Sequence, residues 1–226
     1  MTTQTIAYYL CIIFAFVPAI VLHEVSHGFA AYKLGDPTAK DAGRLTVNPL
    51  AHVDPFGTIV LPLLLMMAHA PVFGYAKPVP YNPRYFKDKR KGDLIVGLAG
   101  PAANLVMALV GAGLAHALYP LAAQGLSNDA FAYFYLLFLP YFTLINLYLM
   151  FFNLLPIPPL DGSSIFAFLL PERHLPGYYR IQRYAMPMLL VLLFVVPYIF
   201  PVDPISLYMN FFAGNLANLL FPFKIS

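Results

Sequence analysis

Long apolar stretches alternate with short polar segments along the chain. A membrane-spanning helix needs about 20 mostly apolar residues, and residues 6–31, 94–118 and 131–155 each supply such a stretch. Residues 184–200 predict another span, and residues 204–223 predict either a last span or a helix lying at the interface. The pattern predicts an all-α polytopic membrane protein with about four to five transmembrane helices.

One apolar segment, residues 56–70, is too short to cross a bilayer comfortably and is interrupted by Gly57 and Pro62. We expect it to enter the membrane and return as a re-entrant segment. Residues 43–47 alternate in polarity, which predicts a short β-strand at the membrane surface, and residues 74–80 form an extended, proline-punctuated stretch.

The composition agrees with this pattern. The 226 residues are 60% hydrophobic and 10% charged, whereas soluble domains carry about 25% charged residues. No interval is polar and long enough for a separate soluble domain, so residues 1–226 are predicted to form one membrane-embedded domain, with a core at 6–165 and C-terminal helices at 178–223. Cys11 is the single cysteine, which excludes a disulfide within the chain.

The distribution of positive charge predicts how the chain is oriented. Twelve of the 13 lysines and arginines lie in three polar segments, residues 32–55, 71–93 and 162–183. If residues 56–70 dip and return, all three segments share one face, whereas a full crossing would move the middle segment to the other face. Cytoplasmic loops carry the excess of Lys and Arg, which favours the dip, a cytoplasmic position for these segments and no role for nucleic acid.

The first apolar stretch ends in the motif H-E-V-S-H, which contains His23, Glu24 and His27. Residues four apart lie on one face of a helix, so both imidazoles can reach one metal ion with the carboxylate beside them. Two histidines that bind Zn²⁺, and a glutamate that takes a proton from water activated by zinc, are typical of a zinc hydrolase.

Asp161 is the candidate for a third ligand. It lies in N-L-L-P-I-P-P-L-D-G, where prolines and glycine break the helix predicted at residues 131–155, and ionisable groups at membrane depth are candidates for function. The dip of residues 56–70 makes the spans at 6–31 and 131–155 run in the same direction. Asp161 would then lie at the depth of His23 and His27.

Other interpretations stay open at this point. His52 could lie behind the metal ligands or be an ordinary loop residue. A membrane di-iron enzyme would need many more histidines than the motif supplies. A metal transporter or an inactive metal-binding scaffold would need no glutamate beside its first ligand, so Glu24 favours the hydrolase.

Three motifs in this order resemble the site-2 proteases, a family of zinc-dependent intramembrane proteases. They are H-E-V-S-H-G at residues 23–28, G-P-A-A-N at 100–104 and N-L-L-P-I-P-P-L-D-G at 153–162. The loop sequences N-P-L-A-H-V-D-P and G-Y-A-K-P-V-P are also similar to those of small prokaryotic members. The resemblance covers about residues 6–165, and the third motif departs from one common form by having Ser163 after D-G.

The resemblance implies one Zn²⁺ per chain, bound by His23, His27 and Asp161, with Glu24 as the general base. Asn104 and Asn153 would lie near the site and contact the substrate or the oxyanion. The activity would be cleavage of peptide bonds within or next to transmembrane segments of membrane proteins or signal-peptide-like remnants, with the active site toward the cytoplasmic side. No segment resembles a PDZ or CBS domain, and the oligomeric state is left open.

Overall fold

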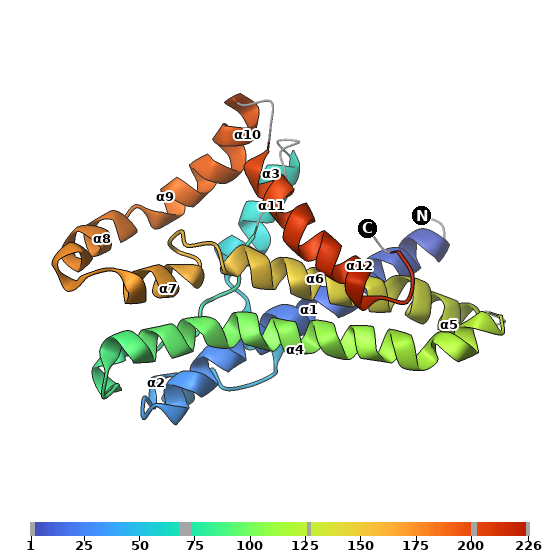
Figure 1. Ribbon diagram of the computed structural model, residues 1–226, viewed down its shortest axis with the longest axis horizontal. Coiled ribbons are helices and arrows are strands. Elements are labelled where there is room, and N and C mark those ends of the chain that lie inside the picture. The colour runs from blue at the N-terminus through green and yellow to red at the C-terminus, as the bar shows by residue number, and fades with distance from the viewer. Residues whose placement is uncertain (1–2, 68–73, 126–127, 200–202, 225–226) are drawn as a thin grey trace.

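Three long helices form the centre of the computed structural model, which describes residues 3–67, 74–125, 128–199 and 203–224. They are α1 (Thr3–Lys33), α4 (Lys89–Ala123) and the continuous helix Asp129–Asn153, which consists of α5 (Asp129–Tyr133), the π-helical turn η4 (Phe134–Phe138) and α6 (Leu139–Asn153). All three are long and apolar enough to cross a membrane. They lie side by side, as Figure 1 shows.

The directions of the long helices agree with the prediction. α1 and α6 run the same way and α4 runs against them, so that α1 ends, α4 begins and α6 ends toward the same side of the molecule (Figure 1). Small residues of α4 allow α6 to approach closely. Gly111 faces Thr143 and Phe142 of α6, so that a methyl group there would lie 2.5 Å from the Thr143 hydroxyl oxygen.

The predicted dip forms a hairpin. Residues Pro55–Met67 make a short helix, composed of the π-helical turn η2 (Pro55–Val60) and α3 (Leu61–Met67). The chain then returns beside its own entry point, because the Tyr75 N–H donates to the Gly57 carbonyl (3.1 Å) and the Lys77 N–H donates to the His52 carbonyl (2.9 Å). Residues 68–70 of the predicted segment lie outside the described residues.

The prediction of short surface strands is wrong, since the described part of the chain contains no strand. Side chains satisfy the backbone where a strand was expected at residues 43–47. The Arg44 guanidinium donates to the Lys77 carbonyl (2.6 Å), and His52 Nε2 bonds the Thr46 carbonyl (2.9 Å). The Arg44 side chain thus joins residues 43–47 to residues 74–80, and the described residues show no backbone hydrogen bond between these two segments.

The C-terminal third adds shorter helices. α7 (Gly162–Leu169), η5 (Glu172–His174) and α8 (Leu175–Gln182) follow the long helices. Next come α9 (Ala185–Leu190), η6 (Val191–Val195) and α10 (Val196–Ile199), which diverge from the bundle, while α11 (Pro204–Met209), η7 (Asn210–Gly214) and α12 (Asn215–Leu220) pass over α6 (Figure 1). In the described residues three helices meet the length and apolarity of a span, fewer than the four to five expected, because Ala185–Val195 is apolar but short.

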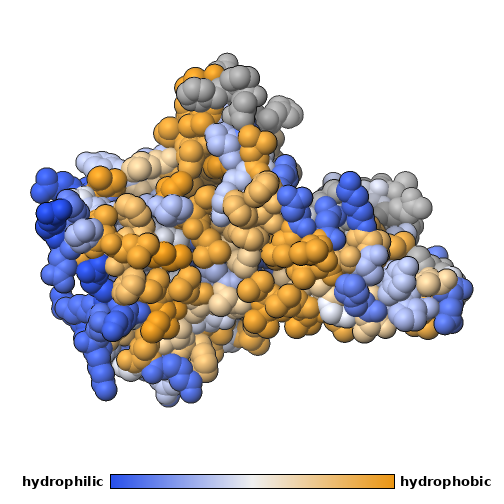
Figure 2. All heavy atoms as spheres, in the orientation of Figure 1, coloured by the Kyte–Doolittle hydropathy of each residue, from blue (hydrophilic) through white to orange (hydrophobic). Residues whose placement is uncertain are grey.

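The surface is that of a membrane protein. Hydrophobic residues cover the middle of the molecule, and hydrophilic residues gather at the end where α2 (Thr38–Asp41), the start of α4 and α8 lie (Figure 2). Large side chains on the outer faces of the long helices are exposed, for example Phe14 (63%) and Val106 (60%). A soluble protein rarely exposes so continuous an apolar surface, whereas lipid tails cover it at no cost.

Candidate metal centre

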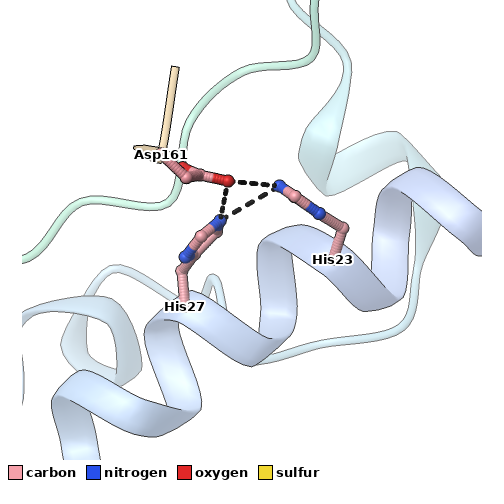
Figure 3. A group of neighbouring side chains, drawn as sticks. All are labelled: His23, His27 and Asp161. Atoms are coloured by element: carbon pink, nitrogen blue, oxygen red, sulfur yellow. Dashed lines mark hydrogen bonds and ion pairs between the residues drawn. The ribbon is translucent and has the colours of Figure 1, made fainter. Parts of the chain in front are cut away.

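Three side chains meet between α1 and the turn that precedes α7. His23 and His27 project from one face of α1 toward Asp161, as Figure 3 shows. The Oδ2 atom of Asp161 lies 3.1 Å from His23 Nε2 and 3.4 Å from His27 Nε2, and the two Nε2 atoms are 3.1 Å apart. Both histidines are buried, and Asp161 is partly buried.

The spacing of these atoms fits a zinc ion. Bonds of about 2.0–2.2 Å in a tetrahedron place neighbouring ligand atoms about 3.3 Å apart, and the three observed separations lie close to this value. The set of two imidazoles and one carboxylate is also a common one for zinc, with the fourth position left open for water or substrate.

The hydrogen bonds of the imidazoles support the same conclusion. His27 Nδ1 lies 2.7 Å from the Val96 carbonyl, which can only accept, so this nitrogen carries the proton. His23 Nδ1 lies 2.5 Å from Asn104 Oδ1. The two Nε2 atoms therefore present lone pairs to each other and to a carboxylate, a repulsive arrangement that a bound cation relieves.

The backbone around Asp161 is held from both sides. Ser164 Oγ donates to the Asp161 carbonyl (2.7 Å), which fixes the start of α7. At the other end of α7, the Arg90 guanidinium donates to the carbonyls of Phe168 and Leu170, each at 2.6 Å. Because Arg90 belongs to α4, α7 and its preceding aspartate are fastened to the long helices.

Gly100 of α4 leaves the room that a metal centre needs. A Cβ atom at this position would lie 2.7 Å from His23 Nε2 and would crowd His27 Nε2 as well. The space between the ligands is thus bounded by bare backbone, and any larger residue would occupy it.

Glu24 lies beside the ligands at the wall of a cavity of about 470 Å³. Its Oε2 atom accepts a hydrogen bond from the Val79 backbone N–H (3.0 Å). The same cavity is lined by His23, His27 and Asp161, by residues 74–76 and 78–79 of the extended segment, and by Asn153. A carboxylate, the metal-binding side chains and open volume are therefore brought together.

The structure separates the remaining candidates. Asn153 lines the cavity, and its amide nitrogen donates to the Leu149 carbonyl (3.0 Å). Asn104 does lie near the site, but it is completely buried behind His23, both ends of its amide are bonded to protein and it does not line the cavity, so its expected contact with substrate or an oxyanion gains no support from this structure. His52 lines a second, apolar cavity of about 420 Å³ instead of standing behind the ligands.

Sequence reasoning missed Asn146, which is completely buried and whose Oδ1 accepts a hydrogen bond from Asn104 Nδ2 (2.8 Å). An asparagine inside an apolar span was the available signal, since polar side chains in membranes need partners. The Val96 carbonyl and the Val79 N–H are backbone groups, which no residue type reveals. Their roles follow only from the tertiary structure.

The chain is similar to known proteins over most of its length. The model of Peptidase family M50 matches residues 117–196. YwhC of Bacillus subtilis strain 168 is 39% identical over 191 residues, which cover 82% of this chain and 80% of the relative. Rip2 of Mycolicibacterium smegmatis is 34% identical over 156 residues (68% of this chain, 55% of the relative), and Rip2 of Mycobacterium tuberculosis H37Rv is 29% identical over 201 residues (87% and 72%). All three carry the words zinc metalloprotease in their names. No solved structure matches.

The fold and the site define a zinc metalloprotease built into a membrane. The identity with YwhC over most of both chains places the protein more narrowly: it belongs to peptidase family M50, the site-2 proteases.

Replacing Gly100 with alanine tests the room at the centre. We expect Gly100→Ala to lose most of its bound zinc, because the new methyl group would enter the space between the two imidazoles. Zinc content per purified protein measures the effect. Gly113→Ala is the matched control, since Gly113 lies on the same helix with nothing within 4 Å of its added Cβ. Equal zinc content in both variants would contradict the site.

Proposed function

We propose that the protein is an intramembrane zinc endopeptidase that cleaves peptide bonds within or next to transmembrane segments of membrane proteins. One zinc ion per chain is held by His23, His27 and Asp161, and Glu24 is the general base. The observation that carries this proposal is the convergence of three ligand atoms at 3.1–3.4 Å beside a glutamate in a cavity between membrane helices.

Each residue has a separate task in hydrolysis. When bound, zinc supplies a Lewis acid that makes water a better nucleophile at neutral pH and polarises the substrate carbonyl. Glu24 accepts the proton of the attacking water and returns a proton to the leaving amine. The Val79 N–H, which bonds Glu24 Oε2, holds this carboxylate in place at the cavity wall. Asn153, at the same wall, is available to bind substrate.

The substrate must present an unwound backbone, because a helix hides its peptide groups in its own hydrogen bonds. Residues 74–80 can receive such a segment by β-addition. Tyr75 and Lys77 direct their N–H groups to the loop at residues 52–57. Ala76, between them, lines the cavity, and its backbone groups have no hydrogen-bond partner in the described part of the chain. This supports residues 74–80 over residues 43–47 as the docking edge.

The active site faces the cytoplasmic side of the bilayer in this proposal. Hydrophilic residues lie at both ends of the molecule (Figure 2), but twelve of the 13 lysines and arginines lie in the three segments expected at the end nearest the site. The positive-inside rule assigns such a face to the cytoplasm. Substrates would be membrane proteins or signal-peptide-like remnants that reach the site within the lipid bilayer.

Glu24→Gln tests the base. We expect cleavage to fall by at least about 100-fold, since general acid–base catalysis contributes about 10²–10⁴-fold, while zinc content stays near that of the wild type. Cleavage of membrane-protein segments by purified protein in lipid, with zinc content measured in parallel, gives both values. Glu172→Gln, an exposed glutamate, is the control. Undiminished cleavage by Glu24→Gln would rule out the hydrolytic role and favour a metal-binding scaffold.

Ala76→Pro tests the docking edge. Proline removes the free N–H group while remaining compatible with an extended backbone, so we expect slower cleavage with zinc retained. Ala76→Val adds bulk but keeps the N–H group and should cleave faster than Ala76→Pro. Cleavage rates at low substrate concentration compare the two. Equal cleavage rates for the wild type and Ala76→Pro would rule out substrate binding by β-addition at residues 74–80.

Cysteine labelling tests the orientation. In a Cys11→Ser background, single cysteines replace Arg84, in the basic segment, and Gly125, beyond the end of α4. We expect membrane-impermeant reagents to label the Gly125 position in intact cells and the Arg84 position only after the membrane is opened. The reverse pattern, or labelling of both from one side, would contradict the proposed topology.

A further inference from the structure

A chain of buried polar groups runs from α6 through α4 to the first histidine of the metal centre. Asn104 of α4 and Asn146 of α6 are completely buried, and His23 of α1 is 7% exposed. In apolar surroundings each of these groups depends on the others for its hydrogen bonds. No motif that marks the metal ligands contains Asn146.

The geometry fixes which group donates and which accepts at each hydrogen bond of this buried series. Asn146 Nδ2 donates to the Phe142 carbonyl (2.8 Å), which leaves Asn146 Oδ1 to accept from Asn104 Nδ2 (2.8 Å). Asn104 Nδ2 also donates to the Ala19 carbonyl (3.2 Å). Both carbonyls can only accept, so the orientation of the two amides follows from the backbone of α6 and α1.

The last link of this series of hydrogen bonds, from Asn104 to His23, determines the tautomer of His23. With both amides oriented in this way, Asn104 Oδ1 is an acceptor 2.5 Å from His23 Nδ1, and this nitrogen must carry the proton. Neutral imidazole then has its lone pair on Nε2, the atom that faces His27 and Asp161. The opposite tautomer would place two acceptors, His23 Nδ1 and Asn104 Oδ1, against each other, and it would put a proton on Nε2, where the metal has to bind.

We propose that Asn146, acting through Asn104, is a positioning residue that fixes the tautomer and the ring orientation of His23 for zinc. The proposal rests on the zinc site proposed above. It extends the metal centre to α6, so that residues of three membrane helices, α1, α4 and α6, determine the tautomer and orientation of His23. Neither asparagine reaches the substrate cavity, and their effect is on the affinity for the metal.

Thr143 provides a matched control. It lies on α6 about one turn before Asn146 and is also completely buried. Its hydroxyl has no hydrogen-bond partner in the described residues, and it faces Gly111, seven residues beyond Asn104 on α4. Thr143→Val therefore removes a buried polar group of α6 without touching the chain to His23.

The experiment measures zinc affinity of full-length protein in lipid nanodiscs by competition with a chelator. Loss of a hydrogen-bonding partner behind a metal ligand typically costs about 10–100-fold in affinity. We expect a loss of this size for Asn104→Leu, a loss near the lower end for Asn146→Leu, and wild-type affinity for Thr143→Val. Asn146→Ser, which shortens the side chain, should weaken zinc binding in the same direction and serves if the leucine variant does not fold.

A second measurement needs no variant. The ¹⁵N chemical shifts of His23 in the zinc-loaded wild type should show the proton on Nδ1 and the metal on Nε2. The opposite assignment would overturn the proposal. So would unchanged zinc affinity in folded Asn104→Leu and Asn146 variants of a wild type that binds zinc. A wild type that binds no zinc would instead overturn the metal site itself.

Discussion

The three candidate zinc ligands, His23, His27 and Asp161, must place one donor atom each about 2 Å from a common point, between apolar helices. The arrangement of the rest of the structure follows from this requirement. His23 and His27 meet it through the repeat of a single helix, but Asp161 comes from a turn more than 130 positions later. α1 and α6 therefore have to run in the same direction. α4 has to pack against the two histidines, with Gly100 at the point of closest approach.

The hairpin with arms at residues 55–67 and 74–77 is the second consequence of the same requirement. It lets the chain return to the side where α1 ended, so that α4 can start there and α6 can end there. The return also brings the extended segment at residues 74–80 along the cavity, where the Val79 N–H binds Glu24. One short apolar hairpin thus sets the direction of two long helices and supplies one wall of the cavity that Glu24 lines.

Burying a polar group in the membrane-embedded part of the protein costs free energy unless the group has a hydrogen-bond partner. Val96 and Asn104 satisfy the outer nitrogens of the two imidazoles, and Asn146 satisfies Asn104. The Arg90 guanidinium donates hydrogen bonds to carbonyls at the end of α7 and so anchors the helix that follows Asp161. The metal centre is consequently supported by each of the three long helices.

Much of this could be predicted from the sequence because bilayers impose strong rules. Span length, the count of basic residues and the i, i+4 spacing of His23 and His27 predicted the three long helices, their directions, the dip and the neighbourhood of Asp161. Predictions failed where short-range pattern was the only guide. The alternation at residues 43–47 indicated a strand, but side chains make the contacts there instead: His52 bonds the Thr46 carbonyl and Arg44 bonds the Lys77 carbonyl.

The sequence by itself determined the class of protein, the two histidines, the adjacent glutamate and the third ligand candidate, since these follow from residue type, spacing and charge. Only the tertiary structure decided that Asn104 stands behind His23 while Asn153 lines the cavity, and that His52 lies apart. It alone revealed Asn146 and the backbone partners at Val79 and Val96. The physical reason is that hydrogen-bond partners are chosen by three-dimensional proximity, and a backbone N–H or carbonyl is the same in every residue that could supply it.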